Sequence, residues 1–123
     1  MICPSNPFLS NEPILAVAGL REAIASCAAP VVAVSPIIGG RAVKGPTAKM
    51  MSELGFTVSA AAVARRYGDL LDGYVLDRAD AANAAELGIP VTLAHTLMAT
   101  LADREDLARR VLASADALAK ATA

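Results

Sequence analysis

The stretch Ser-Pro-Ile-Ile-Gly-Gly-Arg-Ala-Val-Lys-Gly-Pro at residues 35–46 lies between a short apolar run and a helical pattern. The run before it, Val31–Val34, is rich in β-branched residues and is typical of a buried parallel strand. Residues 48–54 after it fit a short helix that Gly55 can end. The order of strand, glycine turn and helix predicts one unit of a parallel α/β sheet.

Three residues of this stretch suggest an anion site. Gly39 and Gly40 can adopt positive φ and let a ligand approach the main chain. Lys44 would add a point charge close to the partial positive charge of the helix start. The spacing fits neither a P-loop nor the GxGxxG pattern. An ordinary strand-to-helix loop that needs glycine for its turns explains the same residues equally well.

Together with Cys-Pro-Ser-Asn-Pro at residues 3–7, the stretch resembles the 2-phospho-L-lactate transferases, some of which transfer a phosphoenolpyruvyl group instead. These enzymes act in the biosynthesis of the 5-deazaflavin coenzyme called F-four-twenty. The resemblance covers nearly the whole chain but only the C-terminal part of the family's length. The family's N-terminal half, with its nucleotide loop and metal-binding aspartates, has no counterpart in this sequence.

The resemblance implies the C-terminal, ligand-binding portion of a transferase that is inactive alone, which leaves open whether this chain is itself an enzyme. The whole enzyme would move a phospholactyl or phosphoenolpyruvyl group from a guanosine diphosphate carrier to a deazaflavin alcohol. Mg²⁺ would bind outside this chain, where we expect no metal ligands and identify no catalytic base. The matched motifs imply these ligand contacts: Ser5, Asn6, Ser35, Gly39, Gly40 and Lys44. The alternative is a noncatalytic nucleotide- or phosphate-binding regulatory module of the same superfamily.

Several polar residues also have structural explanations. Turn chemistry and helix capping explain Ser5 and Asn6 without a ligand. Asp77 and Asp80 follow an expected strand and could hold Mg²⁺ through water, but capping of a helix over 81–87 by Asp80 is the favoured interpretation. Asp103 is expected to cap the last helix. The two cysteines, at positions 3 and 27, are expected to be reduced and half-buried.

Composition narrows the possible classes of protein. The 123 residues suit a single domain over 1–123, and 55% hydrophobic with 3% aromatic residues predicts a core of Ala, Val and Leu. A net charge of −1 gives no indication of nonspecific nucleic-acid binding through a basic face. No apolar run is long enough to cross a membrane and no signal peptide is evident, so we expect a soluble, cytoplasmic protein.

The expected fold is α/β, a small parallel Rossmann-like sheet flanked by helices and part of a larger family fold. Strands are expected at about 31–35, 73–77 and 91–94, with helices over about 11–27, 48–54, 60–67, 81–87 and 104–119. The resemblance implies a fourth strand that begins before Met1. Without it one sheet edge stays unpaired, so we expect a homo-oligomer or association with the missing half.

Overall fold

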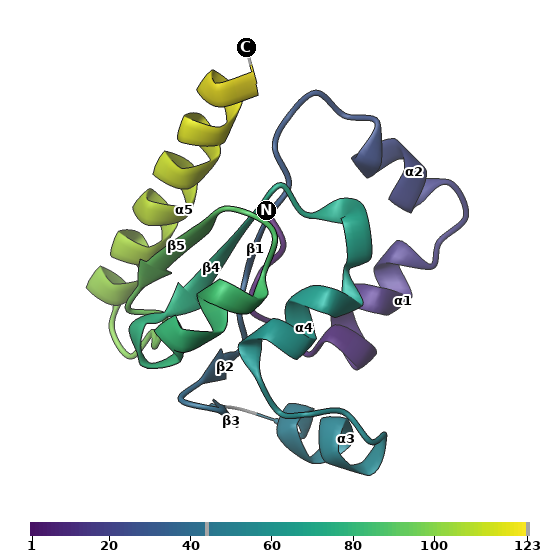
Figure 1. The fold of residues 1–123 in the computed structure, drawn as a ribbon, viewed down its shortest axis with the longest axis vertical. Coiled ribbons are helices and arrows are strands. Elements are labelled where there is room, and N and C mark those ends of the chain that lie inside the picture. Colours follow the sequence, from purple (N-terminus) through teal and green to yellow (C-terminus); the bar gives the residue numbers. More distant parts are fainter. Residues whose placement is uncertain (44, 123) are drawn as a thin grey trace.

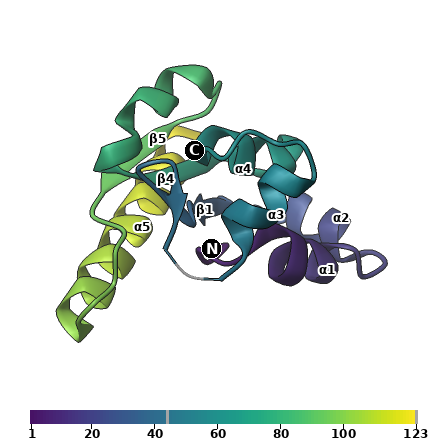
Figure 2. The same ribbon diagram turned by 90° about the horizontal axis from the view of Figure 1, so that it is seen from below.

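The computed structural model describes residues 1–43 and 45–122. Its centre is a parallel sheet of β1 (Val32–Val34), β4 (Gly73–Asp77) and β5 (Val91–Ala94), in the order β1-β4-β5. Helix α5 (Leu101–Thr122) covers one face of this sheet, and the other helices lie on the opposite side (Figures 1 and 2). The predicted α/β class, with a three-stranded parallel sheet, is confirmed.

The strands form where apolar runs can be covered on both faces. All residues of β1 and β4 are buried, as expected for a parallel sheet between helices. One core lies between the sheet and α5 and includes Val34, Val75 and Leu107. Gly73 permits this packing, because a Cβ at that position would lie 2.7 Å from Leu118 Cδ1. Tyr74 and Leu76 belong to the second core, on the opposite face of the sheet.

A single residue extends the sheet beyond β1. The Ile2 N–H donates to the Val32 carbonyl at 2.8 Å, and the Val34 N–H donates to the Ile2 carbonyl at 3.0 Å. Ile2 therefore occupies the position of a fourth parallel strand. Pro4 comes two residues later and has no N–H with which to continue the ladder.

The first helical region differs from the single helix expected over 11–27. It divides into η1 (Pro7–Asn11), α1 (Glu12–Leu15) and α2 (Leu20–Ala25). Gly19 adopts φ +80°, which lies outside the helical range and separates α1 from α2. Asn6 caps η1, because its Oδ1 accepts hydrogen bonds from the N–H groups of Phe8 and Leu9.

The middle helices lie close to their expected ranges. Helix α3 spans Thr47–Glu53 and α4 spans Ala60–Arg66, followed by the short η2 (Gly68–Leu70). Ser59 caps α4 through a 3.0 Å hydrogen bond from the Ala62 N–H to its Oγ, as expected. The segment η3 (Arg78–Glu86) is 3₁₀-helical with a kink at Asp80, and it begins before the helix expected over 81–87.

Helix α5 begins earlier than expected. Asp103 is not its cap but lies within its first turn, where its Oδ2 accepts from the Thr100 N–H at 2.7 Å. Thr100 Oγ1 accepts in return from the Asp103 N–H at 3.2 Å, so the two residues form a capping box.

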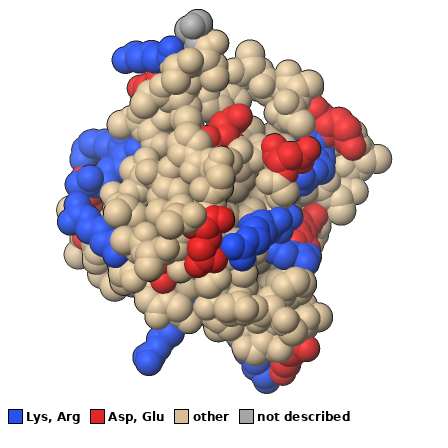
Figure 3. All heavy atoms as spheres, viewed as in Figure 1, with Lys and Arg blue, Asp and Glu red and all other residues tan. Residues whose placement is uncertain are grey.

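The molecular surface carries charges of both signs. Lysine and arginine side chains lie among aspartate and glutamate over the face shown in Figure 3, and several form ion pairs. The cysteines Cys3 and Cys27 are free and exposed, which corrects the expectation that they are half-buried. In residues 1–43 and 45–122, no helix is long and apolar enough to cross a bilayer.

Candidate functional site

A tight hairpin occupies the centre of the glycine-rich stretch. Strands β2 (Ile37–Ile38) and β3 (Arg41–Ala42) pair antiparallel, with Ile38 opposite Arg41. Gly39 and Gly40 form the two-residue turn, with φ of +58° and +71°. Two successive positive φ angles define a type I′ turn, which suits the twist of paired strands. The predicted positive φ is confirmed, but the hairpin itself was not predicted.

The amides of this turn have a partner within the protein. The Gly39 N–H donates to Asp80 Oδ2 at 2.8 Å, and the Gly40 N–H donates to Oδ1 at 2.9 Å. Asp80 is only 6% exposed. The expectation that Asp80 caps the following helix is wrong, because its carboxylate binds the hairpin turn instead. An incoming anion would have to displace this carboxylate to bind the same two amides.

Asp77, at the end of β4, makes a similar set of contacts with the segment after β5. Its Oδ2 accepts from the Thr96 N–H at 2.8 Å and from Thr96 Oγ1 at 3.1 Å. Its Oδ1 accepts from the Ala79 N–H at 2.9 Å, which caps η3. Burial raises the pKa of Asp77, but the hydrogen bonds from Thr96 and Ala79 outweigh burial and hold this pKa below its ordinary value.

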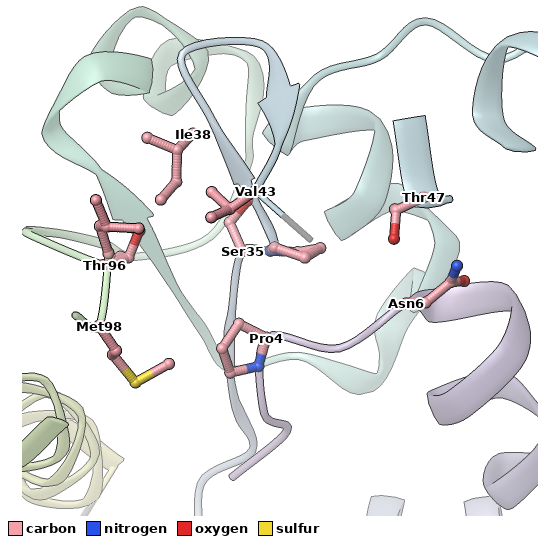
Figure 4. A pocket seen from close by; sticks show the side chains of 10 residues that line it. Pro4, Asn6, Ser35, Ile38, Val43, Thr47, Thr96 and Met98 are labelled. Carbon is pink, nitrogen blue, oxygen red and sulfur yellow. The ribbon is translucent and has the colours of Figure 1, made fainter. Parts of the chain in front are cut away.

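A pocket of about 150 Å³ lies at the carboxyl ends of the strands, beside the hairpin. Asn6 and Thr47 lie on one side of it and Ile38, Thr96 and Met98 on the other, as Figure 4 shows. The remaining lining residues are Pro4, Ser35, Pro36, Val43 and Leu97. Hydroxyl and amide groups on apolar walls suit a ligand that combines hydrogen-bonding atoms with apolar surface.

The structure brings together only some of the expected contacts. Asn6 and Ser35, one from each matched motif, line the same pocket. Ser5 lies instead in a separate groove near Met1 and Ile24. Gly39 and Gly40 are bound by Asp80 and do not line the pocket. The expected contact Lys44 lies outside the described residues.

The polar groups of Asn6 and Ser35 already have partners within the protein. Asn6 Oδ1 caps η1, and its Nδ2 faces Met50 Sδ at 3.5 Å. Ser35 Oγ accepts from the Ile37 N–H at 3.1 Å and donates to the Ile37 carbonyl at 3.2 Å. These contacts fix both side chains at the pocket before any ligand binds.

Sequence reasoning missed Thr47 and Thr96 as pocket residues. Thr96 follows the third expected strand closely, and the carboxyl ends of parallel strands meet at one edge of the sheet. That position was the available signal for Thr96. Thr47 carried no comparable signal, because it begins a helix whose direction depends on the hairpin before it.

The described part of this chain contains no cluster of metal-ligating side chains. In residues 1–43 and 45–122, no group of three or more His, Cys, Asp or Glu side chains could hold a metal ion. The open alternative of a magnesium pair at Asp77 and Asp80 also lacks support, because all four oxygens accept hydrogen bonds from N–H or O–H groups.

Comparison with known proteins identifies the class of protein as a transferase family. The family model for 2-phospho-L-lactate transferase CofD matches residues 1–114, so the chain belongs to this family.

The curated relatives carry two related names. The chain is 45% identical over 117 residues to a phosphoenolpyruvate transferase of Kitasatospora aureofaciens, covering 92% of this chain and 36% of that protein. It is 38% identical over 112 residues to a 2-phospho-L-lactate transferase of Methanocaldococcus jannaschii, covering 91% of this chain and 35% of that protein. The chain therefore spans about a third of the length of these relatives.

Proposed function

We propose that this chain forms the C-terminal ligand-binding portion of a transferase acting in coenzyme biosynthesis in the cytoplasm. The complete enzyme would transfer a phospholactyl or phosphoenolpyruvyl group from a guanosine diphosphate carrier to a deazaflavin alcohol. The observation that supports this proposal is the shared pocket of Asn6 and Ser35, since these residues belong to separate motifs of the family resemblance. The names of the relatives support the choice of a phospholactyl or phosphoenolpyruvyl group as the one transferred.

The proposed chemistry depends mainly on positioning. The substrate hydroxyl attacks phosphorus and GMP leaves. The protein therefore has to align the hydroxyl with the phosphorus and offset the negative charge of the phosphates. Asn6 and Ser35 would contact the ligand directly in the pocket. Lys44 would supply a positive charge, and Gly39 and Gly40 would let the ligand approach the main chain while their N–H groups stay bound to Asp80. Ser5 would contact ligand parts extending beyond the pocket.

The remaining two thirds of the family fold would supply the rest of the site. We propose that Mg²⁺ binds there, because no group of three or more metal-ligating side chains occurs among the described residues of this chain. The proposal therefore assigns the chain a binding role and no turnover of its own.

Two measurements test this function. Incubation of the purified chain with deazaflavin alcohol, the activated donor and Mg²⁺ should give no product, and measurable turnover would disprove inactivity in isolation. Titration with GDP, followed by NMR, should give a dissociation constant no tighter than about 1 mM, because only part of the site is present. The shifts should cluster on residues 35–46 and around Asn6.

A matched pair of lysine variants tests the charge contribution. Lys44→Ala should weaken GDP binding, because it removes a charge-assisted contact of about 1.5–3 kcal/mol. Lys49→Ala should not, since the Lys49 side chain is exposed and faces Glu53 at 3.7 Å. Equal losses of GDP affinity in both variants would indicate that residues 35–46 form a structural turn and not an anion site. GDP binding without transfer, even when the rest of a relative is added, would favour the regulatory-module alternative.

A further inference from the structure

We infer that Asp77 and Asp80 are positioning residues that hold two opposite parts of the pocket lining in place without contacting the ligand. Both residues are only 6% exposed, and neither lines the pocket. They stand three residues apart at the end of β4 and bind segments that are distant in sequence. The inference rests on the proposed function only for its prediction about ligand binding.

Asp80 fixes the hairpin side. Its two oxygens accept from consecutive amides at 2.8 and 2.9 Å, so the turn is held at two points. Ile38 lies directly before this turn and lines the pocket. The hairpin has only two residues in each strand, so its own ladder cannot fix its orientation against the sheet.

Asp77 fixes the β5 side. Its Oδ2 accepts from both the N–H and the hydroxyl of Thr96, which directs that side chain. Leu97 and Met98 continue the lining from the same segment. The segment from 95 to 99 has no regular secondary structure and so lacks the ladder hydrogen bonds that hold β5. The Asp77 carboxylate holds this segment instead.

A carboxylate is the side-chain group suited to this task. Each position requires at least two acceptor oxygens directed at N–H or O–H donors, and an ionised carboxylate has acceptors only. Asparagine at either position would offer one oxygen and turn an NH₂ group toward a donor. Charge-assisted hydrogen bonds are also stronger than neutral ones, which favours a fixed geometry.

The test begins with the unmodified chain and no ligand. Through-hydrogen-bond NMR couplings should join the Gly39 and Gly40 amide nitrogens to the Asp80 carboxyl carbon. The Thr96 amide nitrogen should couple to the Asp77 carboxyl carbon in the same way. Absence of these couplings would overturn the inference, whatever the variants or GDP do.

Variants then separate the two sides of the pocket. Asp80→Asn should shift the amide signals of residues 38–43 and leave those of 95–98 in place, and Asp77→Asn should do the reverse. Asp116→Asn makes the same change at an exposed position of α5 and should shift neither group. Shifts that are the same for both variants would indicate general destabilisation and overturn separate positioning roles.

Binding of GDP links these positions to the proposed function. Each of the first two variants should weaken GDP binding about fivefold, as expected when a hydrogen bond worth about 1 kcal/mol is lost, while Asp116→Asn should have no effect. Unchanged affinity in folded Asp80→Asn and Asp77→Asn would contradict a role in ligand binding. Failure of GDP to bind the unmodified chain would count against the proposed function alone, because the ligand-free couplings test the positioning separately.

Discussion

Glu12 and Arg66, 54 positions apart in sequence, form a two-point ion pair. Arg66 Nε donates to Oε1 at 2.6 Å, and Nη2 donates to Oε2 at 2.7 Å. The guanidinium also lies 4.8 Å from the ring centre of Phe8 and 5.0 Å from that of Phe56. This contact joins α1 to α4 and thereby fixes the N-terminal helices on the rest of the fold.

Arg66→Lys should lower the free energy of unfolding by about 1 kcal/mol, because an ammonium lacks the planar fork and stacks less well on aromatic rings. Urea denaturation measures the change. Arg65→Lys is the control, since its ion pair with Glu86 is exposed and should contribute little. Equal losses in the two variants would mean that the fork geometry of Arg66 has no special effect.

Loss of the hydroxyl group should change the stability of the fold in opposite directions at the two buried tyrosines. The buried Tyr74 hydroxyl makes no hydrogen bond of good geometry with the described residues. Burial raises the pKa of Tyr74, and the Ser35 side chain lies close enough to offset part of this rise. The Tyr67 hydroxyl accepts from Asn11 Nδ2 at 2.7 Å. Tyr74→Phe should therefore stabilise the fold, whereas Tyr67→Phe should cost about 0.5–1.5 kcal/mol. Thermal unfolding compares them, and destabilisation by Tyr74→Phe would reveal a partner for its hydroxyl.

Gly40→Val should destabilise the hairpin by about 1–2 kcal/mol, because a β-branched residue resists the left-handed conformation. The space itself is open, since a Cβ at Gly40 would lie 3.9 Å from the nearest atom, the Val58 carbonyl oxygen. Gly88→Val is the control: Gly88 does not have positive φ and a Cβ there meets nothing within 4 Å. Chemical denaturation should separate the two variants, and similar losses would argue against backbone strain.

Asp77 should make stability depend on acid pH. Its folded-state pKa is lowered, so it stabilises the fold above the unfolded value of about 3.9. This stabilisation should disappear as the pH falls through the folded-state pKa. Urea midpoints measured from pH 6 to pH 3 should fall less steeply for Asp77→Asn than for Asp116→Asn. Identical slopes would show that Asp77 has the same pKa in both states.

The edge at Ile2 should promote association. Apolar grooves on this side are lined by residues including Met1, Ile14 and Ile24, and the Ile14 side chain is exposed. Ile14→Lys should reduce the dimer or larger species in light scattering. Leu112→Lys, at an exposed site on α5, should not. A monomer at high concentration for the unmodified chain would refute the expected association.

The sequence was sufficient to predict the sheet. The strands near 31–35, 73–77 and 91–94 lie within a residue or so of β1, β4 and β5, because apolar runs between glycines and prolines have few other stable conformations. The single helix expected over 11–27 was wrong, because Gly19 adopts a left-handed conformation between α1 and α2. A periodic apolar pattern carries no information on the φ of a single glycine, and a Cβ at Gly19 would meet nothing within 4 Å, so crowding does not explain its conformation.

The candidate site was less predictable. Asn6 and Ser35 were named, and the structure places both at one pocket. The role of Asp80 depends on a contact across 40 residues, and local capping rules assigned it to the wrong segment. The hairpin was missed because two-residue strands are too short to show alternation.

The contact of Asp80 with the hairpin has a consequence for the order of folding. The β2–β3 turn joins neighbouring residues and can close within about 1–10 μs. The Asp80 carboxylate reaches this turn only when the distant β1–β4 pair has formed, since Asp80 lies three residues after the end of β4. The hairpin can therefore form early but acquires its orientation late. In hydrogen exchange, the Gly39 and Gly40 amides should open together with the β4 end of the sheet rather than as an independent local unit.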